Sequence, residues 1–126
     1  MNYILDTHVA LDWINDEKLP TKVSEILEDK DSRLFLSIAS AWEIAIKINI
    51  GKLKLEGGSK EFLSYYESSP VTIAPISHKH LETYESLPLL HKDPFDRIIV
   101  ATAIADNLTL ITNDPEIHKY DVPIHW

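Results

Sequence analysis

The stretch Tyr3-Ile4-Leu5-Asp6-Thr7-His8 decides the fold, because a short and continuously apolar run stops abruptly at an acid. Four further runs of this kind follow along the chain, at residues 33–38, 71–74, 109–112 and 122–124. Most of these runs are too continuously apolar to keep one face in water, which is typical of buried parallel strands. The sequence therefore predicts a mainly parallel sheet that begins with residues 3–5.

Helical patterns separate the apolar runs. They cover residues 8–15, 20–29, 40–50, 59–67, 78–86 and 94–106, with one more turn of helix at 115–119. The sixth pattern has the clearest boundaries, with Asp93 as N-cap, Pro94 at the first helical position and Asn107 at its end. Alternating strands and helices predict an α/β sandwich with right-handed crossovers. In such sheets, ligands bind beyond the carboxyl ends of the strands.

Length and composition favour one intracellular domain. The 126 residues fit a single domain, 1–126, with a core of its own. The absence of cysteine excludes disulfides, thiolate zinc sites and a cysteine nucleophile. With no signal-peptide pattern at the start and no apolar run of the ~20 residues that a membrane helix needs, we expect a cytoplasmic protein.

The net charge of −8, from 20 acids and 12 bases, at first argues against a nucleic-acid partner. Proteins that bind phosphates usually present a basic face. An acidic site that holds divalent cations is an exception, because the ions reverse the local field. The plain alternative is that the excess of acids only keeps the protein soluble.

Two aspartates follow predicted strands directly. Asp6 comes after residues 3–5 and Asp114 comes shortly after residues 109–112. Because parallel strands end at the same edge of a sheet, we expect both carboxylates at that edge. The structural alternative is that each aspartate only caps the helix that follows it.

Two more acids complete a candidate cluster. Glu43 interrupts a helix that is apolar on most sides, although Lys47, four residues later, offers an ordinary ion pair. Asp96 lies in the first turn of the sixth helix, where the helix dipole alone would favour an anion. Asp93 is three residues away, but it serves as the N-cap, so Asp96 is the better ligand candidate.

Four carboxylates in one cleft cannot all stay ionised unaided. Two like charges ~4 Å apart repel by ~4 kcal/mol at an effective dielectric constant of ~20, so protons or cations must enter. Oxygen ligands without cysteine favour Mg²⁺ or Mn²⁺ over zinc. Such ions activate water and stabilise a leaving oxygen, which indicates hydrolysis of phosphodiester bonds.

The sequence resembles PIN-domain toxins of the VapC type over nearly its whole length and in the right order. The segments that carry the resemblance are Ile4–His8, Ser40–Lys47, Gly51–Leu53, His91–Arg97, Leu110–Asp114 and Tyr120–Trp126. The resemblance implies a PIN-like three-layer sandwich, with helices on both sides of the sheet. It also implies an Mg²⁺- or Mn²⁺-dependent endoribonuclease that is a homodimer and is silenced by a VapB-type antitoxin.

Carried over to this chain, the resemblance assigns a role to each acid. Asp6 and Asp96 would be the main metal ligands, Asp114 would bind metal directly or through water, and Glu43 would hold or deprotonate the attacking water. Hydrogen bonds within the acid cluster are expected from Thr7 and Thr112, with Asn113 as a weaker candidate. Apart from the resemblance, four basic residues around the site could attract RNA phosphates, although such side chains on α/β loops are usually only solvated: Lys47, Lys52, Lys92 and Arg97.

Three rival interpretations fit less well. Phosphatases of the haloacid dehalogenase type have an Asp-x-Asp pattern after the first strand, whereas Asp6 is followed two residues later by His8. A receiver-like domain needs an aspartate after the third strand, where residues 73–76 offer none. A PIN-like scaffold that only binds RNA or protein would be expected to have lost at least one of the four acids.

Overall fold

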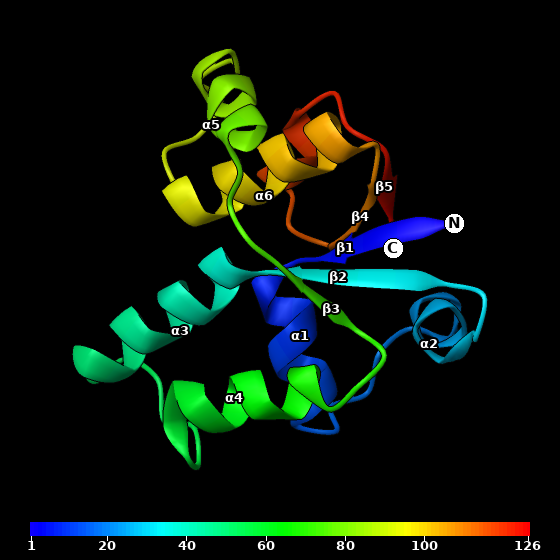
Figure 1. The fold of residues 1–126 in the computed structure, drawn as a ribbon, viewed down its shortest axis with the longest axis vertical. Coiled ribbons are helices and arrows are strands. Elements are labelled where there is room, and N and C mark those ends of the chain that lie inside the picture. Colours follow the sequence, from blue (N-terminus) through cyan, green and yellow to red (C-terminus); the bar gives the residue numbers. More distant parts are fainter.

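The centre of the molecule is a five-stranded sheet (Figure 1). The computed structural model describes all 126 residues. The strands are β1 (Asn2–Leu5), β2 (Arg33–Ser37), β3 (Thr72–Ala74), β4 (Thr109–Ile111) and β5 (Ile124–His125). They lie in the order β3-β2-β1-β4-β5, with β1 in the middle. Every neighbouring pair is parallel, which confirms the predicted sheet.

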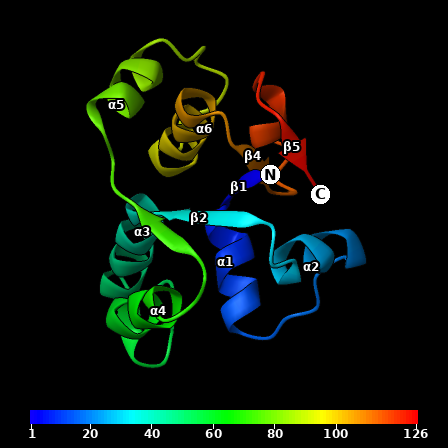
Figure 2. The same cartoon turned by 45° about the vertical axis from the view of Figure 1, so that its right-hand side comes forward.

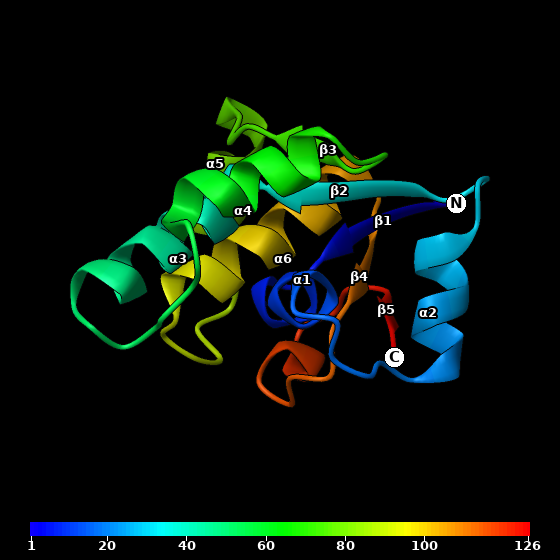
Figure 3. The same cartoon turned by 90° about the horizontal axis from the view of Figure 1, so that it is seen from below.

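Helices cover both faces of this sheet. They are α1 (Thr7–Ile14), α2 (Thr21–Glu28), α3 (Ile38–Asn49), α4 (Gly58–Glu67), α5 (His78–Glu85) and α6 (Pro94–Asp106), with a 3₁₀ turn η1 (Ile117–Lys119). Figures 1 and 2 show α5 and α6 on one side, and α1, α2 and α4 on the other. Figure 3 shows α1 and α4 in front of the strands when the molecule is seen from below. The predicted three-layer α/β sandwich is therefore confirmed.

Strand residues alternate between two buried cores. Leu5 and Ile111 belong to the core under α1, α2 and α4, whereas Ile4 and Leu110 belong to the core under α6. All four side chains are fully buried. Because successive strand residues point to opposite faces, two covered faces favour apolar residues at consecutive positions in the middle of a strand. This preference explains the continuous apolar runs in the sequence.

The ends of several elements differ from the prediction by one or two residues. Ile38, predicted in the second strand, is the first residue of α3, because the Ser37 hydroxyl accepts the N–H of Ala39 at 3.0 Å and starts the helix there. Val122 and Pro123 precede β5 rather than belong to it. None of the helices combines the length and the apolar character that crossing a bilayer requires.

The predicted boundaries of α6 are confirmed. Asp93 Oδ1 accepts the backbone N–H groups of Phe95 at 2.9 Å and Asp96 at 3.2 Å. Asn107 ends the helix with φ 55°, in the left-handed region that asparagine tolerates better than most residues. The Asp93 cap thus fixes the first turn of α6, and with it the backbone position of Asp96.

Candidate active site

The centre of the candidate site lies where β1 and β4 end. Leu5 pairs with Ile111, so the next residues, Asp6 and Thr112, stand side by side at the carboxyl edge of the sheet. The Thr112 hydroxyl donates to Asp6 Oδ2 at 2.7 Å and accepts the backbone N–H of Asp114 at 3.1 Å. The predicted hydrogen bond from Thr112 is confirmed, and this one side chain connects two of the predicted site acids.

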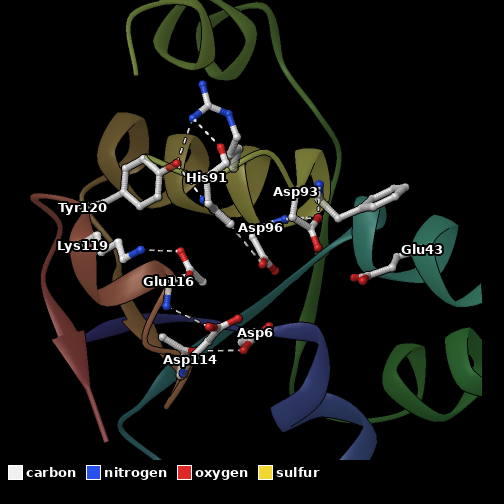
Figure 4. Close-up of polar contacts among 12 residues, drawn as sticks. Asp6, Glu43, His91, Asp93, Asp96, Asp114, Glu116, Lys119 and Tyr120 are labelled. Carbon is white, nitrogen blue, oxygen red and sulfur yellow. Dashed lines mark hydrogen bonds and ion pairs between the residues drawn. The ribbon is translucent and has the colours of Figure 1, made fainter. Parts of the chain in front are cut away.

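Glu43 and Asp96 approach the same edge from two helices. Glu43 lies in the second turn of α3, which starts directly after β2, and Asp96 lies in the first turn of α6. Figure 4 shows both carboxylates pointing into the space that Asp6 and Asp114 also face. Asp6 is 1% exposed, Glu43 4% and Asp96 7%. The four predicted acids therefore face one another, and three of them are buried.

The four carboxylates are not close enough together to hold a metal ion in the arrangement seen here. In the positions that they occupy, no three acidic or histidine side chains are close enough to ligate one ion. Two buried oxygens, Asp6 Oδ1 and Glu43 Oε1, have no hydrogen-bond partner. A buried acceptor without a donor costs free energy, and a charged acceptor costs more. The site thus contains buried carboxyl oxygens without partners, which a cation would satisfy.

Burial and mutual repulsion change the proton affinity of these acids. Burial, followed by the charges of Asp93, Asp6, Asp114 and Glu43, raises the pKa of Asp96 to about 8. Burial also raises the pKa of Asp6, and Asp114 adds to this effect, although the hydrogen bond from Thr112 opposes it. The other three predicted acids therefore all act electrostatically on Asp96.

The donor set fits a hard divalent cation. Every candidate ligand is a carboxylate oxygen, and no cysteine exists anywhere in the chain. Mg²⁺ and Mn²⁺ prefer such oxygens, whereas sites for softer metals use sulfur or imidazole. A dication would neutralise the repulsion that raises the pKa of Asp96 and would pair the free oxygens of Asp6 and Glu43.

The capping alternatives have different outcomes for the two strand-end aspartates. Asp6 occupies the N-cap position of α1, but its side chain makes no capping hydrogen bond. Asp114 does cap the turn after it, because its Oδ1 accepts the N–H of Glu116 at 2.9 Å. Capping therefore does not account for Asp6, and it uses only one oxygen of Asp114.

The ion-pair alternative for Glu43 is also realised in part. Lys47 Nζ lies 3.1 Å from Glu43 Oε2, as the spacing of four residues predicts. The other oxygen, Oε1, is the one left buried without a partner. Lys47 therefore holds one side of the carboxylate while the other side remains available.

Two of the predicted supporting residues make no hydrogen bond to the acids. The buried Thr7 hydroxyl lies 2.8 Å from the Ser40 hydroxyl, so Thr7 links α1 to α3 and the prediction that it hydrogen-bonds to an acid is wrong. Asn113 is exposed, and its side chain makes no hydrogen bond within the cluster.

Sequence patterns missed a connected group beside Asp96. His91 Nε2 lies 3.3 Å from Asp96 Oδ2, and His91 Nδ1 lies 2.8 Å from the Tyr120 hydroxyl. Arg97, predicted to attract phosphates, is instead 6% exposed and donates to the Tyr120 hydroxyl at 2.8 Å. The one available signal was the closeness of His91 and Arg97 to Asp96 in the sequence. Lys52 and Lys92 remain exposed.

The double role of Thr112 leads to a stability prediction. Thr112→Val keeps the shape of the side chain but removes the donor to Asp6 and the acceptor for Asp114. Hydrogen bonds to charged groups contribute about 1.5–3 kcal/mol, so we expect the free energy of unfolding to fall by about 2 kcal/mol. Urea denaturation measures this change. Thr112→Ser, which keeps the hydroxyl, should lose clearly less, and equal losses in both variants would contradict the role of the hydroxyl.

Comparison with known proteins gives a family match and structural neighbours. The model of the family described as PIN domain matches residues 3–123. Comparison with curated protein sequences gives no significant match. Among solved structures, the chain is similar to VapBC2 from Rickettsia felis bound to a DNA fragment from its promoter. The TM-score is 0.75 and the identity 23%, over 99% of this chain and 98% of that chain.

Two further neighbours extend the comparison. One is VapBC-1 from nontypeable Haemophilus influenzae, with a TM-score of 0.69 and 20% identity over 99% of this chain and 97% of that chain. The other is FitAcB from Neisseria gonorrhoeae, with a TM-score of 0.66 and 19% identity over 100% and 97% of the two chains. At these identities the likeness concerns the fold.

Proposed function

The chain belongs to the PIN domain family, because the model of that family matches residues 3–123, and from this we propose that it is a metal-dependent endoribonuclease. The observation that carries the proposal is the cluster of Asp6, Glu43 and Asp96, buried at one sheet edge with unpaired oxygens. We propose that the whole chain, 1–126, acts as one PIN domain.

The proposed roles follow from the surroundings of each acid. Asp6 and Asp96 hold Mg²⁺ or Mn²⁺, and Asp114 contributes directly or through water. When bound, the ion supplies positive charge to phosphate oxygens and makes water more acidic. Glu43 holds the attacking water and takes up its proton at Oε1, because Oε2 is already paired with Lys47. Thr112 keeps Asp6 in place by donating to Oδ2.

We also propose that the protein is the toxin of a toxin–antitoxin pair, acting on RNA in the cytoplasm as a homodimer and silenced by a VapB-type antitoxin. The similarity to VapBC complexes supports this proposal. An apolar groove of about 220 Å³ next to the site supports a protein partner. Trp42 lines this groove, 61% exposed, with its ring edge-on to Phe95 at 5.1 Å.

Cleavage of RNA by the purified protein tests the proposal. We expect mixed RNA to be cut with Mg²⁺ or Mn²⁺ and to stay intact with EDTA, because the ion supplies the positive charge that stabilises the phosphate oxygens during cleavage. The alternative function, a PIN-like scaffold, predicts RNA or protein binding without cleavage and no difference in EDTA. Gel analysis of the RNA separates the two outcomes.

A further inference from the structure

We propose that His91, held by Tyr120 and Arg97, is a positioning residue that fixes the Asp96 carboxylate for metal binding. This inference rests on the proposed metal site and adds residues to it. The residues come from three places: the loop before α6, the first turn of α6 and the segment after η1. Figure 4 shows dashed contacts that lead from Tyr120 to His91 and from His91 to Asp96.

The three side chains and the carboxylate form one continuous chain of contacts. Arg97 Nη1 lies 2.8 Å from the Tyr120 oxygen, which lies 2.8 Å from His91 Nδ1. His91 Nε2 then lies 3.3 Å from Asp96 Oδ2. Tyr120 and Arg97 are 5% and 6% exposed, so the inner part of the chain is shielded from water.

The chemistry of the four groups limits which atoms donate and which accept in these contacts. Arginine only donates, so the Tyr120 oxygen accepts from Arg97, and its own O–H is then free to donate to His91 Nδ1. A neutral histidine that accepts at Nδ1 carries its proton on Nε2. That N–H points at Asp96 Oδ2, whereas the other tautomer would direct a lone pair at the carboxylate. With Tyr120 donating to Nδ1, His91 presents an N–H to Asp96 in the ionised form that would bind a metal.

The far end of the chain is firmly anchored. Arg97 Nη1 also donates to the carbonyl oxygens of Pro88 at 2.9 Å and His91 at 3.4 Å. Its guanidinium lies over the Tyr84 ring, 5.0 Å from the centroid. The rings of His91 and Tyr120 meet edge to face with centroids 5.4 Å apart. Because both ends of the His91 ring are held, Asp96 Oδ2 is fixed and Oδ1 is left for the metal.

Mn²⁺ titration of a matched set of variants tests the positioning role. Outer hydrogen bonds of this kind typically change metal affinity by about 10–100-fold. We therefore expect His91→Phe, which keeps a ring but loses the N–H, to weaken Mn²⁺ binding measured by calorimetry within that range. His91→Gln places an amide N–H close to the position of Nε2 and should restore most of the affinity. A purely structural role for the ring would not produce this rescue.

Tyr120→Phe provides a second and milder variant. It removes a single oxygen, so it should fold even if His91→Phe does not, and we expect roughly 3–10-fold weaker Mn²⁺ binding. The double variant should bind no more weakly than His91→Phe alone, because both changes break the same chain of contacts. His80→Gln is the matched control, since His80 is a buried histidine paired with Asp106 at 2.7 Å outside the site.

The outcomes separate this inference from the proposed function. Wild-type affinity in folded His91→Phe or Tyr120→Phe would overturn the positioning role while Asp96→Asn still loses Mn²⁺, which leaves the metal site standing. An equal loss in His80→Gln would overturn it too, by showing that the effect is not specific. If the wild-type protein binds no Mn²⁺, or if Asp96→Asn binds it normally, both the metal site and the role of His91 are wrong.

Discussion

Asp96→Asn is expected to abolish RNA cleavage and, at the same time, to stabilise the protein in the absence of metal. The two effects have one cause. Asp96 is 7% exposed and faces the charges of Asp93, Asp6, Asp114 and Glu43, which together with burial raise its pKa to about 8. Asparagine has nearly the same size and no charge at any pH, so it avoids the free-energy cost of either burying the charge or taking up a proton. It also removes a ligand for the cation.

The expected sizes follow from general rules. Loss of a ligand that stabilises charge in the transition state costs several kcal/mol, so cleavage should fall by at least about 10³-fold, or ~4 kcal/mol. In EDTA near neutral pH, the melting temperature should rise by several degrees, because about 1 kcal/mol corresponds to ~4 °C in a chain of this size. RNA cleavage assays and thermal melts of the same preparation measure both.

Asp31→Asn is a suitable control for this pair of effects. Asp31 is exposed in the turn before β2, at the opposite end of the strands from the four acids. This variant should keep both the cleavage rate and the melting temperature of the wild-type protein. Asp6→Asn should also abolish cleavage. Normal cleavage by Asp96→Asn at saturating Mg²⁺ would show that the proposed role of Asp96 is wrong.

The fold was predictable from sequence because burial on both faces leaves a simple pattern. Ile4 and Leu5 pack into different cores, so both faces of β1 are apolar at these two positions. A strand with one wet face would have alternated instead. The exact strand ends were less predictable, because the Ser37 cap and the geometry before β5 depend on neighbouring backbone rather than on periodicity.

The acids of the site were predictable for a related reason. Asp6 directly follows a buried strand, and Glu43 interrupts an apolar helix, so both stand out against their surroundings. The parallel sheet then gathers the strand ends at one edge, which is how residues 106 positions apart, Asp6 and Thr112, come into hydrogen-bonding distance. Topology supplies that closeness without any long-range sequence signal.

The contacts between individual side chains were not predictable in this way. The pairing of Thr7 with Ser40 and of His91 with Tyr120 depends on how loops and helix starts pack, and no local period encodes it. Arg97 shows the difficulty best. Its charge favoured a surface role, yet three oxygen acceptors and two aromatic rings surround its guanidinium in the structure.

In EDTA, the stability of the wild-type protein relative to Asp96→Asn is expected to fall as pH rises toward about 8. Burial first, and then the neighbouring acids, raise the pKa of Asp96 from 3.8 in the unfolded chain to about 8 in the folded protein. Between these values the folded state binds a proton that the unfolded state lacks. The stability that Asp96 contributes is therefore complete below about pH 4, declines through this window and levels off above about pH 8.

Thermal melts of both proteins between about pH 5.5 and 9 measure this difference. Groups that do not interact with Asp96 titrate alike in both proteins and cancel in the comparison. The gap in melting temperature should widen up to about pH 8 and then stay constant. A gap that is constant throughout, or that narrows as pH rises, would contradict the electrostatic cause assigned to Asp96.

Added Mn²⁺ should reverse the loss of stability at high pH in the wild-type protein but not in Asp96→Asn. A ligand present at 100 times its dissociation constant stabilises the folded state by about 2.7 kcal/mol. Because the ion must displace the proton from Asp96, its stabilising effect should be larger at pH 8 than at pH 6. Asp96→Asn has no such proton to lose, so its melting temperature should respond weakly and equally at both pH values. A Mn²⁺ effect on the wild-type protein that is independent of pH would mean that Asp96 does not ligate the ion.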